Sequence, residues 1–161
     1  MMSTTVPMTE RNLAHAEAIR MLKARYFRNM DQRDWEAMID VFVDDAVMDM
    51  RSEMAALAHA GLAVDPQAGL IEGRPAILQA MSSALVGTIT VHHGHMGEID
   101  ILSDNEAEGI WPMRDVILMP EGSPVRQLRG YGHYHERYRR VAEGEWRIAH
   151  LRLSRLMIEW I

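Results

Sequence analysis

The chain has 161 residues, 48% of them apolar and 25% charged, which is typical of one ordinary globular domain spanning residues 1–161. It has no cysteine, which excludes a disulfide framework, a thiolate nucleophile and a cysteine-bound zinc or iron–sulfur site. The formal charge is -6 and the basic residues are dispersed, so we expect no nucleic acid partner. No stretch reaches the roughly 20 apolar residues of a membrane span and no signal peptide is found, so we expect a cytoplasmic protein with no membrane contact.

The first part of the chain has the apolar period of helices. Thr9 is a good N-cap for a helix that continues to about Met30. Asp34 is a good N-cap for a second helix, whose apolar stripe continues to Val43. Residues 46–50 then predict a short strand.

A longer connection follows this strand. Residues 51–70 predict a small helix and a loop, which we expect to be a lid or rim insertion or a plain surface excursion. Pro75 stands in the first turn of a third helix that begins after Gly73. At the N-terminus, residues 1–8 are expected to be a flexible tail.

After Gly87 the pattern changes to that of strands. Short, turn-rich connections separate the strands, so neighbouring strands should be antiparallel. Four long strands are predicted, over residues 88–102, 106–119, 125–141 and 145–160. Helices followed by such a meander predict an α+β domain with the helices on one face of the sheet.

Six of the eight histidines fall on three of these strands. Alternation places His133 and His135 on one side of the third strand, and His150 on the same side of the fourth strand as Ile148. On the first strand, His92, His93 and His95 lie close together, and two nearby glycines allow a bulge to decide which of them points inward. A curved sheet would gather several histidines around an internal pocket. The 14 methionines suit an adaptable core or a pocket for an apolar ligand.

Several motifs resemble SnoaL-like proteins of the nuclear transport factor 2-like superfamily. Residues 26–35 (YFRNMDQRDW) and 42–46 (FVDDA) resemble the opening of that family, and residues 71–77 and 138–148 resemble its later landmarks. The resemblance covers residues 10–157. It implies a cone-shaped α+β barrel, in which a curved, mostly antiparallel sheet wraps around three N-terminal helices and encloses a cavity.

The subgroup that the chain resembles includes scytalone dehydratase, bile acid 7α-dehydratase and hexachlorocyclohexane dehydrochlorinase. The resemblance implies that Asp31 and His92 form a catalytic pair and that Tyr26 donates a hydrogen bond to a substrate oxygen. An imidazole can accept a proton from carbon, and a carboxylate on its other nitrogen fixes the tautomer and stabilises the imidazolium. Six further residues are expected to bind substrate: His93, Trp111, His133, His135, His150 and Arg152.

Three functions are compatible with these features. The leading hypothesis is a lyase or isomerase without cofactor or metal, acting on a small-to-medium apolar cyclic or polycyclic molecule. The first alternative is a non-catalytic ligand-binding or assembly module of the same fold. The second is a metal-dependent enzyme that uses two His-x-His pairs, 93–95 and 133–135. Family analogy also implies a homodimer or homotrimer.

Overall fold

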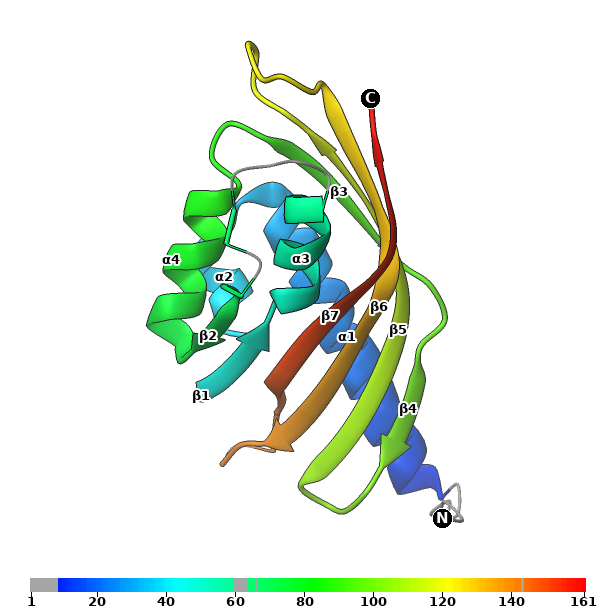
Figure 1. Ribbon diagram of the computed structural model, residues 1–161. Coiled ribbons are helices and arrows are strands. Elements are labelled where there is room, and N and C mark those ends of the chain that lie inside the picture. The colour runs from blue at the N-terminus through cyan, green and yellow to red at the C-terminus, as the bar shows by residue number, and fades with distance from the viewer. Residues whose placement is uncertain (1–8, 60–63, 66, 143) are drawn as a thin grey trace.

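The computed structural model describes residues 9–59, 64–65, 67–142 and 144–161, so the predicted tail 1–8 and part of the connection 51–70 lie outside the described residues. Its framework is a seven-stranded sheet in the order β2-β1-β7-β6-β5-β3, with β4 also paired to β5 (Figure 1). The strands are β1 (Phe42–Asp49), β2 (Leu70–Glu72), β3 (Ile89–Gly94), β4 (Glu98–Ile101), β5 (Glu106–Leu118), β6 (Gln127–Arg140) and β7 (Trp146–Trp160). Only the β1–β7 pair is parallel among the strand pairs of the described chain, so the predicted antiparallel meander is confirmed.

The helices pack on one face of this curved sheet, which confirms the predicted cone-like α+β fold (Figure 1). They are α1 (Glu10–Gln32), α2 (Trp35–Ile39), α3 (Arg51–His59) and α4 (Arg74–Ala84). The predicted N-cap of α1 is confirmed, because the Thr9 hydroxyl accepts a hydrogen bond from the Asn12 amide. The apolar stripe of α1, which includes Ile19, Leu22 and Met30, is buried against the sheet. Within the described residues, none of the helices combines the length and the apolar character needed to cross a membrane.

The second helix is shorter than predicted. Asp34 caps it as expected, but α2 ends at Ile39 and Phe42 already belongs to β1. The helical prediction for residues up to Val43 is therefore wrong. The cause lies in the tertiary structure: the main-chain amide of Ile148 donates a 2.8 Å hydrogen bond to the Val41 carbonyl, and Phe42 is aligned with Ile148 in the parallel ladder. Strand β7 therefore recruits this segment into the sheet.

The first long strand is interrupted. The predicted strand 88–102 is divided into β3 and β4, which pair with successive parts of β5. Three residues, 95–97, lie opposite only two on β5, Trp111 and Pro112. A Cβ on Gly97 would lie 2.4 Å from the Trp111 ring, so glycine is needed for this close approach. This irregularity lies where the two glycines allowed a bulge, while the short strand β2 was not predicted.

Candidate active site

The side chains of Asp31, in the last turn of α1, and His92, on β3, are in direct contact. His92 Nδ1 lies 2.6 Å from Asp31 Oδ1, and the His92 amide donates a 2.9 Å hydrogen bond to Asp31 Oδ2. The Thr90 hydroxyl donates a further hydrogen bond of 2.9 Å to Asp31 Oδ1. Both carboxylate oxygens therefore hold β3, and Nε2 is the imidazole nitrogen left for a ligand.

Arg33 fastens the end of α1 to the same strand. It adopts a left-handed conformation with φ 61°, and its guanidinium donates hydrogen bonds of 2.9 Å to the hydroxyls of Thr88 and Thr90. Burial alone would raise the pKa of Asp31. Hydrogen bonds from the His92 ring, the His92 amide and Thr90, together with the charge on His92, outweigh burial and lower that pKa. Asp31 is therefore held as a carboxylate beside the imidazole.

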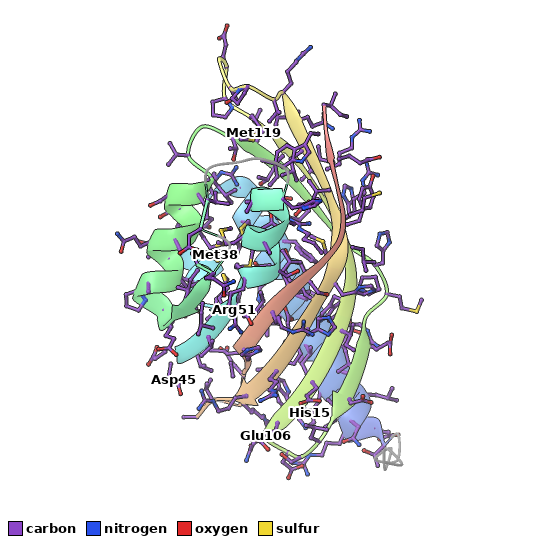
Figure 2. All side chains as sticks on the ribbon, in the orientation of Figure 1. His15, Met38, Asp45, Arg51, Glu106 and Met119 are labelled. Atoms are coloured by element: carbon purple, nitrogen blue, oxygen red, sulfur yellow. The ribbon has the colours of Figure 1, made fainter. Side chains whose placement is uncertain are left out.

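His92 faces a cavity of about 370 Å³ between the helices and the sheet. This cavity lies toward the end of the molecule that carries Met119, and away from the end that carries His15 (Figure 2). Most of its lining is apolar, with five methionines among the residues that form it: Met30, Met50, Met54, Met81 and Met119. Its size and character suit a small-to-medium apolar ligand.

Tyr26 also lines this cavity and is 2% exposed. Its ring contacts those of Phe27 and Tyr134, at centroid distances of 5.6 and 6.0 Å. Burial, reinforced by the charge on Glu136, raises the pKa of the Tyr26 hydroxyl far above its ordinary value. The hydroxyl therefore stays protonated and can donate a hydrogen bond.

Three charged residues of the cavity wall were missed by the sequence analysis: Glu53, Asp115 and Arg155. The Arg155 guanidinium donates two hydrogen bonds to the Asp115 carboxylate, of 3.1 and 2.7 Å, and a third from Nε to Glu53. The Arg155 and Glu53 side chains are only 4% and 9% exposed. Burial opposes the charge on Arg155, but the two carboxylates outweigh it and raise the pKa of the guanidinium.

Glycine makes this contact possible. Arg155 on β7 reaches Asp115 on β5 across Gly130 on β6, where an added Cβ would lie 2.1 Å from Arg155 Nη1. Asp115 is also the register partner of His92 in the β3–β5 ladder. The signal that could have identified Arg155 is its alternation with Leu151 and Leu153, both of which are buried.

The six residues predicted to bind substrate are all among the described residues, and they lie elsewhere than on the cavity wall. His133 and His135 do share one side of β6, as predicted, but the opposite side, with Tyr134 and Tyr138, is the one that packs into the core. His93 follows His92 on β3 and is exposed on the opposite face. The prediction that the strand histidines gather around the internal pocket is therefore wrong.

A bulge in β7 explains the placement of His150 and Arg152. Tyr138 pairs with Ile148 and Arg137 pairs with His150, so Ala149 is an extra residue in β7. This reverses the alternation, and His150 and Arg152 lie on the outer face instead of beside Ile148. Trp111, the sixth residue, is buried and its Nε1–H donates a 2.7 Å hydrogen bond to the Tyr138 hydroxyl.

The two His-x-His pairs do not converge on one point. His93 and His95 lie at the interruption between β3 and β4, whereas His133 and His135 lie on β6. In the part of the chain that the structure describes, no three His, Asp or Glu side chains are grouped in a way that would hold a metal ion. Burial, and then the charges of neighbouring arginines, lower the pKa values of His135 and His150.

Similar solved structures reproduce this fold. They include a candidate scytalone dehydratase from Novosphingobium aromaticivorans DSM 12444 (20% identity, TM-score 0.76, covering 94% of this chain and 91% of that chain). A hexachlorocyclohexane dehydrochlorinase, LinA type 2, has 18% identity and a TM-score of 0.75, with the same coverage of 94% and 91%. A candidate aromatic ring hydroxylase from N. aromaticivorans has 21% identity, a TM-score of 0.72 and coverage of 97% and 96%. At these identities the likeness establishes the fold alone.

The family is established by a sequence match. Residues 11–152 match the model of the SnoaL-like domain, which is most of the chain. The motifs at residues 26–35 and 138–148 fall inside this match. The chain therefore belongs to the SnoaL-like domain family, as the resemblance predicted.

Proposed function

We propose that this protein is a cofactor-free lyase or isomerase that removes a proton from carbon in a small-to-medium apolar cyclic substrate. The observation that carries this proposal is the 2.6 Å contact between His92 and Asp31 at the wall of an apolar cavity. Two of the similar solved structures are named as a dehydratase and a dehydrochlorinase, and both names describe lyases. The family and the site together support the same class of reaction.

His92 acts as the general base. Because Asp31 accepts a hydrogen bond from Nδ1–H, the lone pair of Nε2 is directed to the substrate. Nε2 takes a proton from carbon, and the electron pair of the broken C–H bond forms a carbon–carbon double bond as the leaving group departs. The Asp31 carboxylate stabilises the imidazolium formed in this step. In an isomerisation, the imidazolium would return the proton to another carbon.

Tyr26 acts as a hydrogen-bond donor to an oxygen atom of the substrate. Its protonated hydroxyl donates a hydrogen bond to a leaving or carbonyl oxygen, where negative charge develops. The polar part of the cavity wall contains two carboxylates, Asp115 and Glu53, which both contact the guanidinium of Arg155. This net negative charge disfavours an anionic substrate, because an anion would be repelled in an environment of low dielectric constant.

The same cavity would serve a non-catalytic binding module. That alternative expects Asp31 and His92 to be apart or the cavity to be filled by side chains. Their contact at 2.6 Å and the cavity of about 370 Å³ favour the enzyme. A binding module would hold the ligand without exchanging its protons.

The test begins with a ligand, sought by native mass spectrometry of the purified protein and by thermal shift with uncharged cyclic compounds. Proton abstraction is then measured as deuterium exchange into the ligand in D2O, and elimination as release of water or halide. We expect His92→Ala and Asp31→Asn to lower either rate by about 100-fold or more. A cooperative melting transition would show that both variants are folded, although Asp31→Asn should melt at a lower temperature because it loses the hydrogen bonds of the carboxylate.

His93→Ala is the matched control. It removes the next imidazole on β3, which is exposed on the outer face, and should leave the rate unchanged. Exchange or elimination by His92→Ala at the rate of the unaltered protein would rule out the proposed base. Tight binding with no exchange in the unaltered protein would identify a binding module.

We also propose that a second copy of the chain covers the outer sheet face. An outer patch, defined by two register rows, is formed by Val91, His93, Arg114, Val116, Arg129, Tyr131, Met157 and Glu159. Val91 and Met157 are 45% and 48% exposed. The Nε atoms of Arg114 and Arg129 are buried without a hydrogen-bond partner among the described residues. Because Arg129 lies beside Glu159, a two-fold axis would pair each arginine with the glutamate of the other copy.

A further inference from the structure

A buried ion pair lies directly behind the cavity wall. The Lys23 and Glu136 side chains are 1% and 0% exposed, and Lys23 Nζ lies 2.5 Å from Glu136 Oε1. Both are among the described residues, and neither contributes to the cavity lining, so the proposed reaction does not use them. Burial lowers the pKa of Lys23, and Glu136 opposes that shift. Removing two charges from water into a protein core costs free energy, so the presence of this pair requires an explanation.

Stability is a poor explanation for this pair. Replacing a buried ion pair by apolar residues of similar volume often leaves a protein as stable or makes it more stable. The core around the pair is already rich in aromatic and aliphatic residues, which would accept such a replacement. A role in the arrangement of neighbouring groups is the better explanation.

The Lys23 ammonium contacts three aromatic rings. Its Nζ lies 3.7 Å from the centroid of Tyr134, 4.3 Å from that of Tyr26 and 4.6 Å from that of Phe27. A cation is attracted to the face of each ring, most strongly where water is excluded. One lysine therefore holds three rings that come from α1 and β6.

The partner carboxylate is fixed in turn. Glu136 Oε2 accepts a hydrogen bond from the Tyr138 hydroxyl, whose oxygen accepts the Nε1–H of Trp111 at 2.7 Å. Tyr138 and Trp111 are 2% and 5% exposed, so this chain of hydrogen bonds is shielded from solvent. The fixed carboxylate of Glu136 therefore holds the Lys23 ammonium in a single position.

These rings reach the proposed catalytic groups. Tyr26 and Tyr134 line the cavity, and Phe27 stacks on the His92 ring with a centroid distance of 5.9 Å and an angle of 15°. Phe27 can approach β3 because residue 94 is glycine, where a Cβ would lie 2.5 Å from the Phe27 ring. Lys23 is thus separated from His92 by one aromatic ring.

We propose that Lys23 and Glu136 are positioning residues, which orient the Tyr26 hydroxyl directly and the His92 imidazole through Phe27. The proposal rests on the proposed function, in which these two groups donate and accept protons. Their positions matter because a displacement of about 1 Å at a reacting group can cost about 100-fold in rate.

The test is the double variant Lys23→Met/Glu136→Gln, which removes both charges and keeps similar volumes. The chain has only two phenylalanines and four tyrosines, so ring signals from labelled protein can be assigned by NMR. We expect the signals of Phe27, Tyr26 and Tyr134 to move and their ring flips to become faster, together with a change in the His92 imidazole signals. Tyr131, which is on the outer face, should not change. With the identified substrate, kcat should fall by about 10-fold or more while KM changes less.

Ile39→Val is the matched control for a small loss of core packing, because Ile39 on α2 is buried and lies outside both the cavity lining and the hydrogen-bond chain of Glu136. It should leave the rings of Phe27 and Tyr26 and the value of kcat unchanged. A folded double variant with unaltered ring signals and unaltered kcat would overturn the proposal and leave the pair with a packing role only.

Phe27→Leu keeps the test valid if the double variant does not fold. It preserves the ion pair and removes the ring between Lys23 and His92, so the His92 imidazole signals should change in the same way. Unaltered His92 signals in this variant would overturn the proposal. Absence of turnover in the unaltered protein would instead contradict the proposed function, since the ring signals are measured without substrate.

Discussion

The nitrogens of His92 have different surroundings, and this difference defines the chemistry of the site. Nδ1 contacts a carboxylate that is held by three hydrogen bonds from β3, whereas the ring also forms part of an apolar wall. His93, one residue away, has neither the carboxylate nor the wall. The family resemblance implied that His92 pairs with Asp31, and their contact is present at 2.6 Å.

The lowered pKa of Asp31 predicts a pH dependence of stability. Because this pKa lies below the ordinary value of 3.8 in the folded protein, the unfolded chain binds the proton more readily. The stabilisation from Asp31 is therefore complete above that value and is lost as the pH falls through the pKa of the folded protein. The difference in free energy of unfolding between the unaltered protein and Asp31→Asn, measured with urea, should be nearly constant from about pH 6 to about pH 5 and should shrink as the pH falls below 3.8.

Thr90→Val gives an internal comparison for this measurement. It removes one of the hydrogen bonds that lower the pKa of Asp31 and leaves both bonds from His92. We expect it to retain most of the pH dependence that Asp31→Asn abolishes. A difference between the unaltered protein and Asp31→Asn that stays constant with pH would contradict the assigned shift.

At the scale of elements, the features set by local sequence were predicted well. The N-caps Thr9 and Asp34 are confirmed, because a capping side chain bonds to amides within its own turn. The long strands β5 and β6 are confirmed within one or two residues at each end. Such features depend on residues that are neighbours in the sequence.

The missed features depend on partners distant in the sequence. The chain leaves the helix before Phe42 because β7, a hundred residues later, offers it a parallel ladder. The extra residue Ala149 reverses the facing of His150 and Arg152, and a bulge of this kind leaves no mark in the alternation of a single strand. Arg155 was missed because alternation counted from Ile148, before the bulge, places it on the outer face, although it is buried beside Asp115.

Helix α3 supplies a prediction at this scale. It covers part of the cavity with Glu53, Met54 and Leu57, and it is joined to β7 by Glu53 with Arg155 and by Ser52 with the Arg155 amide. Glu53→Gln keeps the shape of the side chain and removes its charge. We expect a loss of about 1–3 kcal/mol in the free energy of unfolding, because a buried guanidinium loses a charged partner.

The same variant should loosen α3 in particular. Hydrogen exchange at the amides of α3 should become faster by about 10-fold or more, since local opening no longer breaks a charged hydrogen bond. His59→Gln, at the exposed end of α3, is the control and should leave these exchange rates as they are. Equal exchange rates for α3 in Glu53→Gln and the unaltered protein would show that the contact does not hold the helix.

At the scale of the whole molecule, the two faces of the sheet have distinct roles. The inner face carries the cavity, the candidate catalytic pair and the buried charges. The outer face carries most of the strand histidines and the outer patch, in which arginine, tyrosine and methionine are combined. These three residue types are enriched where protein surfaces meet. The opposite charges of Arg129 and Glu159 lie side by side within the patch.

Association through the outer patch can be measured by sedimentation velocity. The unaltered chain should sediment as a dimer at micromolar concentration, whereas Met157→Glu should sediment as a monomer, because it places a charge beside Tyr131 within the patch. Met21→Glu makes the same chemical change on the exposed side of α1, where the side chain is 53% exposed, and should leave the dimer intact. If Met157→Glu associates as strongly as the unaltered chain, the outer patch is not the interface, and the unpaired Nε atoms of Arg114 and Arg129 require another partner.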